Sequence, residues 1–143
     1  MKKTILLVED SKLQKLVCEK ILHRAGYLLL FAADGEEGLR LIQECIPDLI
    51  LLDLLLPGIG GEEVLLALKR NTRTEPIPVI VLSGVPPSRS TELMAAGAAD
   101  YFEKSRLTQR DGEAALLAAI DAALRESERV NGVRRYKPLA AGT

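Results

Sequence analysis

The chain has 143 residues, of which 48% are hydrophobic and 27% charged, and this composition is typical of one folded domain rather than of a disordered segment. Its 19 lysine and arginine residues and 20 acidic residues give a formal net charge of −1, and only 3% of the residues are aromatic. A basic or stacking surface for nucleic acid is therefore excluded as the main feature. No apolar run approaches the roughly 18 residues of a membrane span or the length of a secretory signal, so we expect a cytoplasmic protein that binds neither membrane nor nucleic acid directly.

Short apolar runs alternate with segments of helical spacing along the chain. In chain order the patterns predict strand 3–8, helix 11–25, strand 27–32, helix 36–45, strand 49–53, helix 62–70, strand 77–82, a short helix within 86–96, strand 100–103 and a helix from about 111 to 128. Five apolar residues recur at helical spacing in the first helix: Leu13, Leu16, Val17, Ile21 and Leu22. This alternation predicts an α/β fold whose parallel sheet is covered by helices on both faces.

The end of the chain differs from the rest in composition. Residues 129–143 lose the helical periodicity and mix glycine, proline and basic residues. Such a segment is typical of a frayed terminus or a linker. We therefore expect one domain over residues 1–128, followed by a C-terminal tail or linker over 129–143.

The two cysteines, Cys18 and Cys45, do not have the spacing of metal ligands. Both lie in segments of helical pattern, where a cysteine is most often a small buried side chain. We therefore expect both to be buried, without a disulfide or a redox pair.

Polar residues close the predicted strands. Glu9 and Asp10 follow the first strand, Asp53 ends the third, Ser83 follows the fourth and Lys104 follows the fifth. Ligands of open α/β sheets gather beyond the carboxyl ends of the strands, so these side chains should meet at one edge of the sheet. Alone, Asp10 could simply cap a helix and Lys104 could be a surface lysine, but together they predict a site for metal and phosphate.

In this order, the residues resemble the receiver domain of two-component response regulators, the CheY-like module of bacterial signalling. The D-x-x-x-P-G run from Asp53 to Gly58 and the pair Gly97 and Ala98 also match, and the resemblance extends over about 3–128. It implies a flavodoxin-like, doubly wound sheet of five parallel strands in the order 2-1-3-4-5, with five helices.

The resemblance also implies the chemistry. Asp53 would be the phosphoacceptor, which receives a phosphoryl group as an acyl phosphate from a partner histidine kinase or histidine phosphotransfer protein. The carboxylates of Glu9, Asp10 and Asp53 would hold Mg²⁺ together with the backbone carbonyl of Leu55, with Glu9 acting through water. Lys104 would neutralise charge on the phosphoryl oxygens.

Ser83 and Tyr101 are the switch residues that the resemblance implies. Ser83 would donate a hydrogen bond to the phosphoryl group, and Tyr101, three residues before Lys104, would turn inward. The surface of the short helix within 86–96, the strand 100–103 and the last helix would then change, and it is a plausible face for a homodimer or a downstream target. The chain would be either a complete regulator that acts by direct contact or the receiver of a longer protein with an output domain.

Several positions depart from the family pattern. Ser105 follows Lys104 in place of the usual proline, and the connection to the last helix carries extra residues. Leu55 and Val85, each two residues beyond a site residue, are both apolar where the family's side chains flank the hydrolytic water. We therefore expect a receiver that dephosphorylates itself slowly.

Three other functions are compatible with parts of this pattern. An aspartyl-phosphate phosphohydrolase of the haloacid dehalogenase type would need an acid two residues after Asp53, where Leu55 stands. A nucleotide-binding domain would need a glycine-rich phosphate loop, and neither G-x-G-x-x-G nor G-x-x-x-x-G-K occurs. A pseudo-receiver that serves only as an interaction module would not need the acids. We therefore expect a signalling domain and no enzyme beyond self-catalysed phosphotransfer and dephosphorylation.

Overall fold

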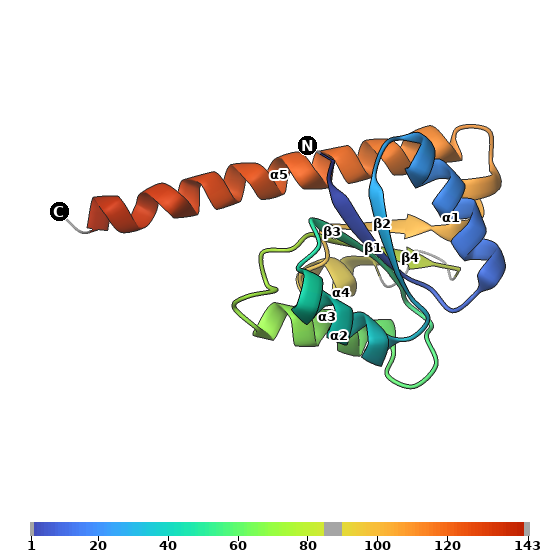
Figure 1. The fold of residues 1–143 in the computed structure, drawn as a ribbon, viewed down its shortest axis with the longest axis horizontal. Helices are drawn as coiled ribbons and strands as arrows, with labels where there is room; N and C mark the ends of the chain where they lie inside the picture. Colours follow the sequence, from blue (N-terminus) through green and yellow to red (C-terminus); the bar gives the residue numbers. More distant parts are fainter. Residues whose placement is uncertain (1, 85–89, 142–143) are drawn as a thin grey trace.

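The computed structural model describes residues 2–84 and 90–141, with side chains described up to residue 132. Strands and helices alternate as the sequence predicts (Figure 1). The elements are β1 (Thr4–Val8), α1 (Lys12–Arg24), β2 (Leu28–Ala32), α2 (Gly35–Cys45), β3 (Leu49–Asp53), α3 (Gly61–Arg70), β4 (Val79–Ser83), α4 (Ser90–Ala95), β5 (Asp100–Glu103), the 3-10 helix η2 (Lys104–Thr108) and α5 (Gly112–Ala141). The predicted strand boundaries hold within two residues, and Ser83 is the last residue of β4 rather than the first after it.

The sheet has five strands in the order β2-β1-β3-β4-β5, all parallel, which confirms the predicted fold class. Every residue of β3 and β4 is buried, as expected for strands that helices cover on both faces. Alternate residues of the strands point to opposite faces of the sheet and contribute to two cores. One core packs against α1 and α5, and the other against α2, α3 and α4 (Figure 1).

Strand register decides where the site forms. Val8 of β1 lies beside Leu52 of β3, and Asp53 lies beside Leu82 of β4. Ser83 in turn lies beside Glu103, the last residue of β5. The carboxyl ends of these strands therefore finish in one row, and the polar residues that close them gather at one edge of the sheet.

Local signals explain how the first helix begins and ends. The Ser11 side chain accepts a hydrogen bond from the amide of Gln14, the usual arrangement at a helix start. After the helix, Gly26 has a φ of +90°, a conformation that glycine adopts at no steric cost. Cys18 is buried on the inner side of this helix, as expected, but the prediction for Cys45 is wrong because this residue is exposed at the end of α2.

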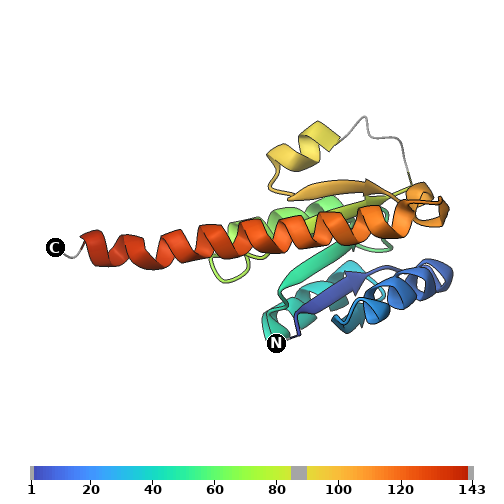
Figure 2. The same cartoon turned by 90° about the horizontal axis from the view of Figure 1, so that it is seen from above.

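The predicted end of the last helix near residue 128 is wrong. Helix α5 continues to Ala141 and projects well beyond the sheet (Figures 1 and 2). Adding a residue to an existing helix costs little, but this segment includes Gly132, at about 1 kcal/mol, and Pro138, at about 3 kcal/mol relative to alanine. Exposed ion pairs of Arg129 with Glu126 (2.6 Å) and of Lys3 with Glu128 (2.9 Å) lie where the extension begins and contribute little. The role of 129–143 as a tail or linker stays a prediction.

Part of one predicted helix lies outside the described residues. Of the segment 86–96, the structure describes α4 from Ser90 onward, and Val85 also falls in the part that is not described. Within the described residues, none of the helices is both long enough and apolar enough to cross a membrane.

Candidate functional site

Three carboxylates meet at the carboxyl edge of the sheet. One oxygen from each of Glu9, Asp10 and Asp53 lies within 4.8 Å of the others. Glu9 is 4% exposed and Asp53 3% exposed, whereas Asp10 is open to solvent. Two acids buried in contact with a third must be compensated by a cation, because desolvation penalises each negative charge.

Lys104 supplies part of that compensation. It follows β5 and its Nζ atom lies 2.8 Å from Oε2 of Glu9 and 3.0 Å from Oδ1 of Asp53. Burial lowers the pKa of Lys104, but its hydrogen bonds to the two carboxylates and their negative charges more than reverse this, so the pKa is raised. The lysine is thus held as a cation over both acids. The residues after it, predicted as a lengthened loop, form η2, and the Lys104–Ser105 peptide bond is trans.

The protonation of Asp53 is shifted by its surroundings. Burial is the main cause that raises the pKa of this carboxyl, the hydrogen bond from Lys104 opposes it and the negative charge of Glu9 adds to it, and the net result is a pKa of about 6. One ammonium therefore does not fully compensate the two buried acids. A second positive charge at this edge would lower the pKa of Asp53 and favour its ionised form.

The oxygen atoms present fit a hard divalent cation such as Mg²⁺. Oε2 of Glu9 is fully buried, and the ammonium of Lys104 lies 2.8 Å from it. A carboxylate oxygen has two lone pairs, so this contact leaves acceptor capacity for a cation or a bound water. Leu55, whose carbonyl was predicted as a ligand, lies next to the cluster, and its amide donates a hydrogen bond to Oδ1 of Asp53 (3.3 Å).

Comparison with known proteins identifies the family. The model of the response regulator receiver domain matches residues 5–120 of the chain. The chain belongs to this family. It is therefore a signalling receiver domain of the two-component response regulators, and its fold agrees with that of CheY-like receiver domains of known structure.

Individual relatives support this assignment. The receiver domain is 39% identical over 71% of its length to the transcriptional regulatory protein AfsQ1 of Streptomyces coelicolor, of which it spans 44%. It is 31% identical over 84% of its length to protein PilH of Pseudomonas aeruginosa, of which it spans 96%. Among solved structures, the Mn(2+)-bound form of response regulator Rcp1 superposes with a TM-score of 0.69 at 33% identity, over 78% of this chain and 86% of that one. The chain spans about half or less of several relatives, as with AfsQ1, and nearly all of others.

The other predicted residues lie on the strands beside the cluster. Ser83 ends β4, the strand next to Asp53, and is 1% exposed. Tyr101 lies on β5 at the edge of the sheet, partly buried against the core on the α2, α3 and α4 side. The receiver domain thus places Ser83 at the same strand edge as Asp53 and Lys104, and Tyr101 on the flanking strand.

Sequence reasoning missed an exposed apolar surface near the site. Leu13 and Leu16 belong to the apolar residues at helical spacing in the first helix, but they are 70% and 53% exposed. Leu55, beside Asp53, is 66% exposed. The signal was present in the sequence, since the five apolar residues of helix 11–25 span more than the one stripe that a packed helix buries.

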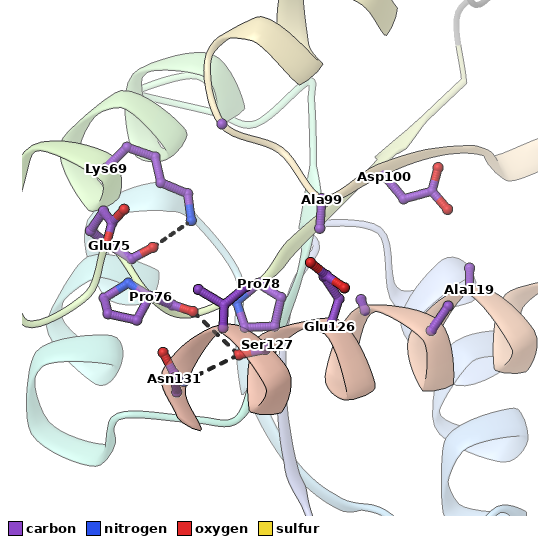
Figure 3. Close-up of a pocket in the computed structure, with 14 residues that line it drawn as sticks. Lys69, Glu75, Pro76, Pro78, Ala99, Asp100, Ala119, Glu126, Ser127 and Asn131 are labelled. Atoms are coloured by element: carbon purple, nitrogen blue, oxygen red, sulfur yellow. Dashed lines mark hydrogen bonds between the residues drawn. The ribbon is translucent and has the colours of Figure 1, made fainter. Parts of the chain in front are cut away.

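The receiver domain also has a cavity of about 350 Å³ at its opposite edge (Figure 3). Its walls come from α5 and from residues before β4 and β5, such as Pro76, Pro78 and Ala99. None of the predicted site residues lines it. The cavity therefore shares no residue with the acid cluster.

Proposed function

We propose that this receiver domain accepts a phosphoryl group on Asp53 from a partner histidine kinase or histidine phosphotransfer protein, in a reaction that depends on Mg²⁺. The observation that carries the proposal is the buried Asp53 carboxylate, clustered with Glu9 and Asp10 and in contact with the Lys104 ammonium. Transfer of an anionic phosphoryl group to an anionic carboxylate requires positive charge at the reacting oxygens. Lys104 supplies part of it, and the Mg²⁺ ion that the acid cluster would hold supplies the rest.

Each residue has a separate task. Asp53 attacks the phosphoryl group and becomes an acyl phosphate. Lys104 neutralises the negative charge of Asp53 before the transfer and the negative charge of the phosphoryl oxygens after it. Ser83 donates its hydroxyl hydrogen to a phosphoryl oxygen.

Glu9, Asp10, Asp53 and the Leu55 carbonyl would hold the Mg²⁺ ion. When bound, the ion would supply positive charge that reduces the repulsion between the Asp53 oxygen and the anionic phosphoryl group. The manganese bound in the structural relative Rcp1 is consistent with a divalent cation in this family. The buried carboxylate of Glu9, which lies against the Lys104 ammonium, has further lone pairs to offer the ion or a water bound to it.

Signalling would follow from a shift between two arrangements of the switch residues. Contact of Ser83 with the phosphoryl group favours an inward Tyr101, and the surface of α4, β5 and α5 changes with it. This surface would bind a second copy, a target protein or an output domain. The relatives include the longer transcriptional regulatory protein AfsQ1 and protein PilH, which has about the length of this chain. Similar receivers therefore occur both within longer regulators and as short chains.

The phosphodonor would dock on the exposed leucines. Leu13 and Leu16, on the helix that follows Asp10, and Leu55, two residues after Asp53, are apolar and open to solvent. An apolar surface beside a charged site gives a partner protein binding affinity and a defined orientation. The donor histidine would then reach Asp53.

One measurement tests the phosphoacceptor role. The protein is incubated with acetyl phosphate and Mg²⁺, and the mass of the intact chain is measured. We expect the mass gain of one phosphoryl group, its loss in Asp53→Ala and in EDTA, and its retention in Asp121→Ala, an exposed acid on α5. No gain with any small-molecule or histidine donor would refute the proposal and favour a pseudo-receiver.

A further inference from the structure

The loop that carries Leu55 is fixed from two sides. It runs from Leu54 to Gly60 between β3 and α3, and the amide of Gly61 donates a hydrogen bond back to the Leu54 carbonyl (3.0 Å). The first turn of α3 is thereby packed directly on the peptide that follows Asp53. Any displacement of this turn would displace the loop.

Gly61 occupies a position with no room for a side chain. A methyl group there would overlap the carbonyl oxygen of Asp53 and would lie 2.8 Å from Cα of Leu54. Both atoms belong to the backbone, so neither can rotate away. The φ of Gly61 is not in the left-handed region, and the glycine is therefore required by space and not by conformation.

Helix α2 holds the other end of the loop. The Glu36 carboxylate accepts a hydrogen bond from the amide of Ile59 through Oε1 (3.3 Å). It also covers Gly58, which has a φ of +73° and at which a Cβ atom would lie 2.8 Å from the same oxygen. Glu36 therefore rests against the turn of the loop.

We propose that Gly61 is a positioning residue for the phosphorylation site, with Glu36 as a second support, and that together they set the affinity of the acidic edge for Mg²⁺. The inference rests on the proposed function, because it assumes that the Leu55 carbonyl belongs to the cation site. Mg²⁺ requires near-octahedral geometry with ligand distances of about 2.0–2.1 Å. A methyl group at Gly61 pushes the Asp53 carbonyl and the loop apart from α3 by about half an ångström, which is large on this scale.

The test compares Gly61→Ala with Gly60→Ala. Gly60 is the neighbouring residue, its φ is −75°, and a Cβ atom there would meet nothing within 4 Å. The dissociation constant for Mg²⁺ is measured by isothermal titration calorimetry, and folding is checked by thermal unfolding in EDTA. The rate of phosphorylation by acetyl phosphate is measured at low and at saturating Mg²⁺.

We expect Gly61→Ala to bind Mg²⁺ roughly tenfold more weakly, with a rate that falls at low Mg²⁺ and recovers in part at saturation. Gly60→Ala should stay within about twofold of the wild type. A folded Gly61→Ala protein with the wild-type dissociation constant would overturn the positioning role, even if it were less stable. A wild type that binds no Mg²⁺ would overturn the proposed function, and the positioning role with it.

A second set of three variants keeps the inference testable if Gly61→Ala does not fold. Glu36 and Glu37 are both acids of the first turn of α2, so each stabilises the helix dipole alike, but of the two it is Glu36 that bonds to Ile59. Glu36→Ala should weaken Mg²⁺ binding roughly threefold, Glu36→Gln should restore it because the amide oxygen still accepts, and Glu37→Ala should not change it. Equal constants for Glu36→Ala and Glu37→Ala would refute the role of Glu36; if Gly61→Ala is also unfolded, they would overturn the inference.

Discussion

The buried charge of Asp53 should make the free protein less stable than a neutral variant. Burial raises the pKa of this carboxyl from 3.8 to about 6, so the ionised form is disfavoured in the folded state. We therefore expect Asp53→Asn, measured without divalent cations, to raise the free energy of unfolding at pH 7. The asparagine keeps the shape of the side chain and an oxygen that can still accept from Lys104.

The size of the effect follows from the shift. About two pKa units correspond to an upper limit of about 3 kcal/mol, because one unit is worth about 1.36 kcal/mol. Asp53 is only 3% exposed, so solvent screening reduces this limit little, and the shift already includes the opposing attraction of Lys104. We expect a gain of about 1 to 3 kcal/mol for Asp53→Asn.

The pH dependence has a definite sign. Between about pH 4 and pH 6 the folded protein holds a proton on Asp53 that the unfolded chain releases, so the stability of the wild type falls as the pH rises through this window. The advantage of Asp53→Asn should therefore be greatest above pH 6 and shrink toward pH 4. Added Mg²⁺ should stabilise the wild type and close the gap, because it binds the folded state.

Urea unfolding in EDTA at pH 4, 5, 6 and 7 measures the effect. Asp121→Asn is the matched control, since it removes the same charge from the exposed surface of α5 and should change stability by less than about 0.5 kcal/mol. A free energy for Asp53→Asn equal to or below that of the wild type at pH 7 would refute the reasoning. So would an advantage that does not depend on pH.

Three further predictions concern other parts of the molecule. Leu55→Asn, which places a polar side chain on the exposed loop beside Asp53, should speed the decay of the phosphorylated protein, as followed by intact mass; equal decay rates would remove the hypothesis of slow dephosphorylation. Leu16→Gln should slow phosphotransfer from a histidine donor roughly tenfold and leave the rate with acetyl phosphate unchanged, and a fall in both rates would exclude a docking role. Ile120→Ala, at a fully buried position of α5, should lower the free energy of unfolding in urea by about 2–5 kcal/mol, against less than about 1 kcal/mol for Leu28→Ala, which is half exposed; similar losses would contradict the two-core description.

The sequence by itself determined the fold class and the members of the site. The apolar runs are short and continuous, so their period and length predict buried parallel strands, and β3 and β5 have the predicted bounds. Parallel strands with helical connections bring their carboxyl ends to one edge, so Glu9, Asp53 and Lys104 could be placed together without coordinates. Both conclusions follow from the order in which apolar runs and polar residues occur along the sequence.

Tertiary structure alone decided contacts that depend on neighbours distant in sequence. The apolar residues of α1 span more than one stripe, so some of them must be exposed, but only the elements that pack against α1 decide that these are Leu13 and Leu16. The extension of α5 past residue 128 continues a helix that the core has already formed, from a point where Glu128 pairs with the distant Lys3. The close packing of Gly61 on Asp53 likewise joins a helix start to a strand end, and distances of this kind are fixed only when the whole core is packed.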